Sequence, residues 1–236
     1  MCTVTFLPLG NTDFILTSNR DEQRLRETLQ PKIYEEDGVE MLYPKDKVAG
    51  GTWIGASSKK RLVCVLNGGF IKHKRKENYP KSRGLIAKEL LKENSLQPYL
   101  ENLDLLDVEP FTMVIVDWNN NELNLVEVVW DEHEKHIITH KNEPKIWSSS
   151  TLYIDEIKKL RKSWFQQWLS ENEFTSEAIL QFHHMETDDK EQSVLMKRIH
   201  VETVSITSVK KMETTIEMMY EDVVHSTKTA VNFNRL

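Results

Sequence analysis

Cysteine is scarce in this sequence: the 236 residues include only two, Cys2 and Cys64. Two cysteines cannot form the dense disulfide framework of a small secreted protein. Neither belongs to a Cys-x-x-Cys pair, so the usual cysteine pattern of a structural zinc site is missing. We therefore expect a chain held together by its hydrophobic core, and the length is sufficient to bury one.

Long apolar runs and an excess of basic residues are also missing. No run approaches the ~20 apolar residues that span a bilayer, and the first residues lack the basic segment and cleavage pattern of a secretory signal. The chain has 31 Lys and Arg against 37 Asp and Glu, a net charge of −6, which disfavours general nucleic-acid binding. We expect a cytoplasmic protein with no transmembrane segment and no nucleic-acid partner. The sequence does not indicate its oligomeric state.

Internal repeats and linkers rich in Pro, Gly or Ser are absent as well, and only 8 Gly and 7 Pro occur in the whole sequence. Hydrophobic residues make up 39% and charged residues 29%, which is ordinary for a folded globular protein and too apolar for a disordered one. Nothing in the sequence marks a boundary between domains. The simplest organisation is a single domain over residues 1–236.

Short segments rich in Val, Ile, Phe and Thr are typical of strands. The sequence predicts them at residues 2–7, 14–18, 50–55, 61–67, 111–117, 122–130, 201–207, 214–220 and 223–233. A polar stretch follows the second of these segments, from Asn19 to Gln30. Residues 62–66 are continuously apolar, as expected of a strand that is covered on both faces.

Three segments are predicted to be helices. Ser82 is a typical N-cap for a helix that continues to about Glu93, and a further helix is expected from Ser176 to Met185. Between Asp155 and Leu169, apolar residues recur at the helical spacing of 157, 160, 164, 165 and 168. Strands and helices do not alternate regularly along the chain, so a doubly wound parallel sheet is disfavoured. The order predicts an α+β fold of layered antiparallel sheets and helices.

Cys2 is the first candidate for chemistry. If Met1 is removed, the thiol and the α-amine belong to one terminal residue, and an amine with a reference pKa near ~7.7–8 can act as the base that activates the thiol. Aminopeptidases usually remove Met when a small residue such as Cys follows. The alternative is that Cys2 is a small residue packed at the start of a strand.

Two polar clusters follow predicted strands. In Asn19-Arg20-Asp21-Glu22, a guanidinium beside carboxylates can orient a substrate or keep a nucleophile in an electropositive environment. In Asn67-Gly68-Gly69, the Asn67 side chain and the Gly68 N–H can donate to an oxyanion. The alternatives are a solvated strand end for the first cluster and a tight turn for the second.

The histidines and one basic run give weaker signals. His183 and His184 are adjacent on a predicted helix and cannot both face one metal ion, and His133 and His136 are not on one face of a strand. We interpret these residues as ordinary polar side chains and expect no metal site. The run from Lys72 to Lys76 is interpreted as an exposed loop that can attract an anionic ligand.

Taken in their order along the chain, the motifs resemble those of one family. They are Met1-Cys2-Thr3, Asn19-Arg20-Asp21-Glu22, Gly51-Thr52-Trp53-Ile54-Gly55, Leu66-Asn67 and Ser82-Arg83-Gly84, followed by Ser148-Ser149-Ser150 and a Trp-bearing helix. The sequence is similar to the NRDE family, the transport-and-Golgi-organisation family named for its Asn-Arg-Asp-Glu motif. The resemblance spans most of the chain and is strongest over the first 85 residues.

This resemblance implies an N-terminal-nucleophile hydrolase fold, a four-layer αββα sandwich of two antiparallel sheets between helix layers. It implies that Cys2 is the nucleophile with its own amine as the base, that Arg20 and Asp21 position it, and that Asn67 is an oxyanion donor. The remaining motif residues are expected at a ligand site: Asn19, Trp53, Gly68, Arg83 and Ser149.

Two functions are compatible with the resemblance. The first is an amidase in which Cys2 attacks a linear amide or a related acyl compound. The second is a non-catalytic binding or trafficking protein on the same fold, whose ligand is haem or an acyl lipid. The second reading is motivated by Ser149, which stands where the family usually has Asn, and by residues 210–215, which lack the Gly and Arg of the family pattern.

Overall fold

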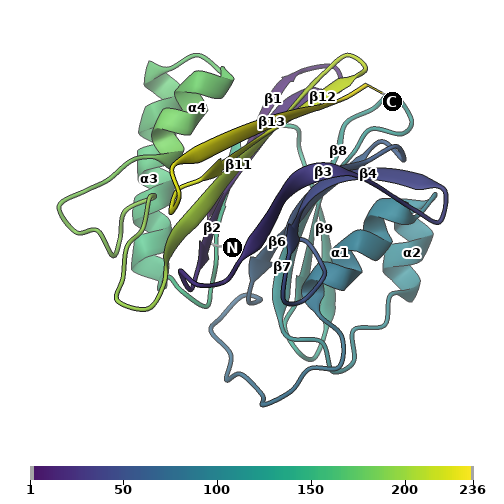
Figure 1. Ribbon diagram of the computed structural model, residues 1–236, viewed down its shortest axis with the longest axis horizontal. Coiled ribbons are helices and arrows are strands. Elements are labelled where there is room, and N and C mark those ends of the chain that lie inside the picture. The colour runs from purple at the N-terminus through teal and green to yellow at the C-terminus, as the bar shows by residue number, and fades with distance from the viewer. Residues whose placement is uncertain (1–2, 235–236) are drawn as a thin grey trace.

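Two antiparallel sheets face each other in the computed structural model, which describes residues 3–234 (Figure 1). The β1 sheet has six strands in the spatial order β10 (Lys145–Ser148), β1 (Thr3–Gly10), β2 (Asp13–Glu22), β11 (Glu202–Met212), β12 (Thr215–Asp222) and β13 (Thr227–Phe233). The β6 sheet has seven in the order β3 (Thr28–Glu36), β4 (Val39–Asp46), β5 (Ile54–Ser57), β6 (Arg61–Asn67), β7 (Phe111–Asp117), β8 (Asn124–Trp130) and β9 (Lys135–His140).

Helices cover the outer face of each sheet (Figure 1). The pair α1 (Arg83–Lys92) and α2 (Leu96–Asn102) packs on the β6 sheet, and the pair α3 (Asp155–Glu171) and α4 (Ser176–His183) packs on the β1 sheet. The result is the predicted four-layer αββα sandwich, so the fold class is confirmed. Within the described residues, no helix has the length and apolarity needed to cross a bilayer.

Strand β2 shows how the sequence produces these layers. Its side chains alternate between the two faces of the sheet, so Phe14 and Leu16 pack between the sheets while Ile15 packs against α3 and α4. All three are fully buried. A strand with apolar partners on both faces needs a continuous apolar run rather than an alternating one, and this is the pattern from Phe14 to Leu16.

Helix α1 begins where the sequence predicts. The hydroxyl of Ser82 accepts a hydrogen bond from the Leu85 N–H, which satisfies one donor of the first turn. The other end is held by Arg61, whose Nη1 donates to the carbonyls of Leu90 at 2.7 Å and Glu93 at 2.8 Å. This guanidinium also pairs with Asp117, and it therefore fastens α1 to two strands of the sheet beneath it.

Several elements differ from the sequence prediction. Strand β2 continues through Glu22, so the first four residues of the expected polar stretch belong to a strand. Three edge or near-edge segments were not predicted as strands: β3, β9 and β10. Strand β4 and the short helix α2 were also missed. Each edge strand has one neighbour at most and a largely exposed or half-buried surface, so its sequence carries no long apolar run.

Candidate functional site

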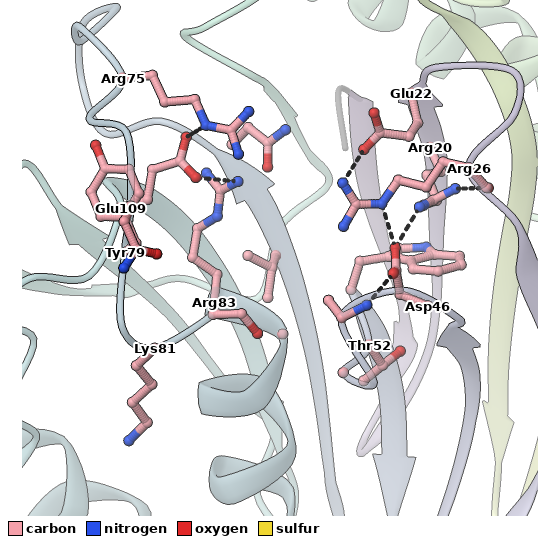
Figure 2. Close-up of a pocket in the computed structure, with 18 of the residues that line it drawn as sticks. Arg20, Glu22, Arg26, Asp46, Thr52, Arg75, Tyr79, Lys81, Arg83 and Glu109 are labelled. Atoms are coloured by element: carbon pink, nitrogen blue, oxygen red, sulfur yellow. Dashed lines mark hydrogen bonds and ion pairs between the residues drawn. The ribbon is translucent and has the colours of Figure 1, made fainter.

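A pocket of about 320 Å³ lies at the end of the sandwich where β2, β4 and β6 end and α1 begins. Figure 2 shows two facing walls. One wall carries residues of β2, β4 and their following loops: Arg20, Glu22, Arg26, Asp46 and Thr52. The other carries residues of the 68–82 loop, α1 and the segment before β7: Arg75, Tyr79, Lys81, Arg83 and Glu109.

Arg20 is the central cation of the first wall and is only 4% exposed. Its Nη2 donates to Asp46 Oδ2 at 2.8 Å, and its guanidinium carbon lies 4.4 Å from the centre of the Trp53 ring. Stacking on an indole and pairing with a carboxylate together fix both the plane and the direction of the fork. Burial lowers the pKa of Arg20, and the negative charges of Glu22 and Asp46 oppose this effect. The guanidinium nevertheless stays positively charged, because the ordinary pKa of arginine lies far above neutral pH.

Asp46 joins two arginines to the loop that follows β4. Its Oδ2 accepts from Arg20 and also from Arg26 Nε at 2.7 Å, while its Oδ1 accepts from the Ala49 N–H at 2.8 Å. Burial alone would raise the pKa of this carboxyl, but the hydrogen bonds from Arg26 and Ala49 and the charges of both arginines lower it. Asp46 is therefore ionised at neutral pH and keeps Arg20 in place.

Two glycines bring separate motifs together at the bottom of the pocket. A Cβ added to Gly51 would lie 2.6 Å from the carbonyl carbon of Gly84, and one added to Gly84 would lie 2.9 Å from the Thr52 carbonyl oxygen. The Thr52 N–H donates to the Gly84 carbonyl at 3.3 Å. The backbone of the 51–52 segment thus contacts the first turn of α1 directly, which only glycine permits at these two positions.

The second wall is organised around Glu109, whose carboxylate faces cations from two elements. Arg83 Nη2 lies 3.0 Å from Oε2 and Arg75 Nε lies 3.8 Å from Oε1, while His73 Nε2 approaches Oε1 to 3.4 Å. Burial lowers the pKa of Arg83, and the negative charge of Glu109 opposes that effect. Arg83 also donates to the Pro110 carbonyl at 3.2 Å, so it is held on two sides, whereas Arg75 is 77% exposed and held by one long contact.

Asn67 lines the pocket at the end of β6. Within residues 3–234 its side chain makes no hydrogen bond, so its amide can donate to a ligand oxygen. Two neighbouring candidates have other roles. The Gly68 N–H, expected as an oxyanion donor, donates instead to the Pro110 carbonyl at 3.0 Å, and the Ser149 hydroxyl donates to the Asn67 carbonyl at 2.7 Å. Both contacts hold the strand end and do not face the pocket.

Asn19 and Asp21 lie on the opposite face of β2 from Arg20, toward α3 and α4. Asn19 Nδ2 donates to the carbonyls of His183 and Val194, and its Oδ1 lies 2.5 Å from His183 Nδ1. Asp21 accepts from Tyr153 at 2.8 Å and from Thr203 at 2.6 Å. Neither residue lines the pocket, because successive strand residues point to alternate faces.

Cys2 lies outside the described residues. The adjoining residue, Thr3, pairs with Asn19 across the β1–β2 ladder, so β1 begins beside the residue that precedes Arg20. Of the nine residues predicted for the site, the structure brings four to the pocket: Arg20, Trp53, Asn67 and Arg83. The other described four do not line it: Asn19 and Asp21 face the helices beside the β1 sheet, and Gly68 and Ser149 hold the end of β6.

The family model described as Transport and Golgi organisation 2 (TANGO2) matches residues 1–230. The chain belongs to the TANGO2 family. This confirms the NRDE resemblance. No curated protein sequence matches the chain.

Several solved structures are similar to this TANGO2-family chain at low sequence identity. A penicillin V acylase from Agrobacterium tumefaciens has a TM-score of 0.65 at 10% identity, covering 100% of this chain and 87% of that one. A mutant conjugated bile acid hydrolase from Clostridium perfringens has 0.63 at 9%, covering 100% and 93%. A Caenorhabditis elegans N-acylethanolamine-hydrolyzing acid amidase orthologue has 0.58 at 12%, covering 88% and 92%. At such identities the likeness establishes the N-terminal-nucleophile hydrolase-like fold alone.

Sequence reasoning did not identify several residues of this site. Arg26, Asp46 and Glu109 lie in or beside loops, and nothing local distinguishes them from other surface charges. Arg161, which is fully buried on α3 outside the pocket, did leave a signal: it lies at the helical spacing of the apolar stripe, four residues after Ile157 and four before Phe165. A charged residue inside an apolar helical stripe can be recognised from the sequence as a candidate buried charge.

Proposed function

We propose that this TANGO2-family chain cleaves a linear amide or a related acyl compound, with Cys2 as the nucleophile after removal of Met1. The α-amine of Cys2 takes the thiol proton, and the thiolate attacks the carbonyl carbon. The amine then passes the proton to the leaving nitrogen as the carbon–nitrogen bond breaks, which leaves a thioester. Water hydrolyses the thioester and regenerates the thiol.

The observation that carries this proposal is the convergence of Arg20, Trp53 and Asn67 on one pocket beside the start of β1. Cys2 directly precedes Thr3 in the sequence. In the proposal Arg20 orients the substrate and favours the thiolate. The unengaged amide of Asn67 donates to the developing oxyanion. Asp21, on the opposite face of β2, helps Arg20 to position Cys2.

The test begins with an intact mass of the purified protein, which must lack Met1. Wild type, Cys2→Ala and Cys64→Ala are then assayed on a panel of acyl amides. Cys64 is a matched control because it is fully buried and burial raises the pKa of its thiol to about 12, so it is inert at neutral pH. We expect turnover by wild type and Cys64→Ala only. A retained Met1, or equal turnover by Cys2→Ala, contradicts the proposal.

A second candidate, binding of haem or an acyl lipid without catalysis, is favoured by the cations of the second wall. Arg75 extends from the basic 72–76 run and is largely exposed, and Arg83 and Lys81 lie on the same wall (Figure 2). The described lining contains no His, Cys or Met, so contacts to anionic propionates or phosphates are favoured over iron ligation. Titration of Cys2→Ala with haem and with an acyl-CoA tests this candidate. Saturable binding that Arg75→Gln weakens is the expected result, and no saturable binding overturns it.

A further inference from the structure

Two arginines are the largest side chains that the structure buries completely, and they differ in one respect. Arg61 pairs with a carboxylate, since its Nε and Nη2 lie 2.8 Å and 2.7 Å from Asp117 Oδ2. Arg161, in the middle of α3, has only neutral hydrogen-bond acceptors within residues 3–234. A buried guanidinium without a carboxylate partner is unusual because burial of an uncompensated charge opposes folding.

The contacts of Arg161 lead to the start of the chain. Its Nη1 donates to the Thr3 hydroxyl, its Nη2 donates to the Ser193 carbonyl, and its Nε donates to the Gln192 carbonyl at 3.2 Å. One face of the guanidinium stacks on Tyr153, with the Cζ atom 3.7 Å from the ring centre. The positive charge is therefore fixed at the side chain of the residue that adjoins Cys2.

The ring of Tyr153 connects this charge to Asp21. Its hydroxyl donates to Asp21 Oδ2 at 2.8 Å, while Arg161 covers the ring itself. Tyr153 thus contacts Arg161 through the face of its ring and Asp21 through its hydroxyl. A carboxylate raises the pKa of a nearby amine, and a guanidinium lowers it. An amine that must accept a proton near neutral pH needs the second effect to offset the first.

We propose that Arg161 is a positioning residue for the amino-terminal nucleophile: its buried charge, held at the Thr3 hydroxyl and linked to Asp21 through Tyr153, keeps the α-amine of Cys2 unprotonated and favours the thiolate. This inference rests on the proposed function. The same charge already affects another neighbour. Burial, followed by the charges of His184 and Arg161, lowers the pKa of His183 to about 3.

Other titratable groups also face the region around Tyr153, and their charges add to the effects of Arg161 and Asp21. Arg198 lies on the loop that follows α4, with its Cζ 5.2 Å from the Tyr153 ring, and it adds positive charge on the solvent side. His183 approaches from α4 and hydrogen-bonds Thr5 at 2.7 Å, but its low pKa keeps it neutral. Asp21 is the carboxylate that faces Arg161 through Tyr153, and Arg20 lies on the other face of β2.

The experiment measures the pH dependence of Cys2 alkylation by iodoacetamide, followed by peptide mass spectrometry, in protein that lacks Met1. Cys64 is buried and serves as an internal unreactive thiol. In Arg161→Met we expect the midpoint of the Cys2 profile to rise by about 0.5–1 pH unit. Arg161→Lys, which retains a charge, is expected to recover most of the wild-type midpoint.

The matched control is Arg61→Met, which removes the other fully buried guanidinium at a distant strand. It is expected to lower stability while leaving the Cys2 midpoint unchanged. A wild-type midpoint near the ordinary ~8.5 of cysteine contradicts the proposed function itself. A depressed wild-type midpoint that Arg161→Met does not move overturns only the role of Arg161.

If Arg161→Met does not fold, Tyr153→Phe gives the same information. This change removes the hydroxyl that donates to Asp21 and leaves the ring under Arg161. Without this hydrogen bond the negative charge of Asp21 is less neutralised by its neighbours. The pH midpoint of Cys2 alkylation is therefore again expected to rise. An unchanged midpoint in folded Tyr153→Phe overturns the inference.

Discussion

At the scale of single residues, the Asn-Arg-Asp-Glu motif serves two faces of one strand. Arg20 points between the sheets to the pocket, whereas Asn19 and Asp21 point to the helices and bind α4, Tyr153 and Thr203. Three consecutive polar residues, Asn19, Arg20 and Asp21, are buried here, which is possible only because each face of the strand supplies partners. The motif is therefore both a structural junction and a part of the candidate site.

His183 provides a residue-scale prediction about pH. It is fully buried between Thr5 and Asn19, and burial is the main cause that lowers its pKa to about 3. In the unfolded chain the imidazole takes up a proton as the pH falls below about 6.5. In the folded chain it takes up this proton only when the pH falls to about 3. Stability of the wild type must therefore fall as pH falls through this interval, by up to about 1.4 kcal/mol per pH unit.

His183→Gln removes this titration. Between pH 7 and pH 5, we expect the wild type to lose about 2 kcal/mol more unfolding free energy than the variant. Urea unfolding at the two pH values measures the difference, and contributions of other groups cancel between the proteins. Parallel pH dependences in wild type and variant would contradict a neutral buried imidazole.

At the scale of elements, the junction between the 51–52 segment and α1 determines the shape of the pocket. Gly84 is in the first turn of α1, where replacement of Gly by Ala normally stabilises a helix by about 1 kcal/mol. Here a Cβ would lie within 2.9 Å of the Thr52 carbonyl oxygen and 3.0 Å of its nitrogen. Both are backbone atoms, which cannot move aside as a flexible side chain can.

We therefore predict that Gly84→Ala destabilises the protein by about 1–3 kcal/mol, opposite in sign to the helix propensity. Chemical denaturation measures the effect. Ser82→Ala is a useful comparison two residues earlier, because it removes the N-cap without adding a clash and is expected to destabilise by about 1 kcal/mol. A stabilised Gly84→Ala variant would show that the two backbones are farther apart.

The elements also show what the sequence could and could not predict. The central strands β1, β2, β6 and β7 were recognisable because both of their faces are buried, and α1 because Ser82 caps it. Strands β3 and β9 are the edges of their sheet and β10 is an edge of the other, and exposed edges leave a weak hydrophobic pattern. Strand β4 is buried but contains Pro44 close to its end, where a turn is the usual expectation.

The same reasoning applies to the site. Arg20, Trp53, Asn67 and Arg83 belong to motifs that could be read in order along the chain, and the structure places all four at one pocket. The partners that hold them could not be read in this way. Asp46 and Glu109 become important only when the end of β4 and the segment before β7 are brought beside β2 and α1, which depends on sheet order rather than on local sequence.

At the scale of the whole molecule, the chain path ties the two sheets together. The chain leaves the β1 sheet after β2, forms all seven strands of the β6 sheet, and returns with β10 to the edge of β1. The core between the sheets therefore contains residues from both ends of the sequence, such as Val4 and Phe233. Neither sheet has a complete core until the other has formed, which favours cooperative folding of the two sheets.

This path predicts how substitutions in separate layers affect unfolding. Leu62 lies between the sheets, Leu90 lies between α1 and the β6 sheet, and Ile179 lies between α4 and the β1 sheet; all are fully buried. Replacing each in turn with Ala is expected to lower the unfolding free energy by about 2–5 kcal/mol. Each variant should retain a single transition, with far-UV circular dichroism and tryptophan fluorescence coinciding. A second transition confined to Ile179→Ala would instead show that α3 and α4 unfold separately from the two sheets, and that the helix layer supporting Thr3 through Arg161 is less stable than the pocket beside it.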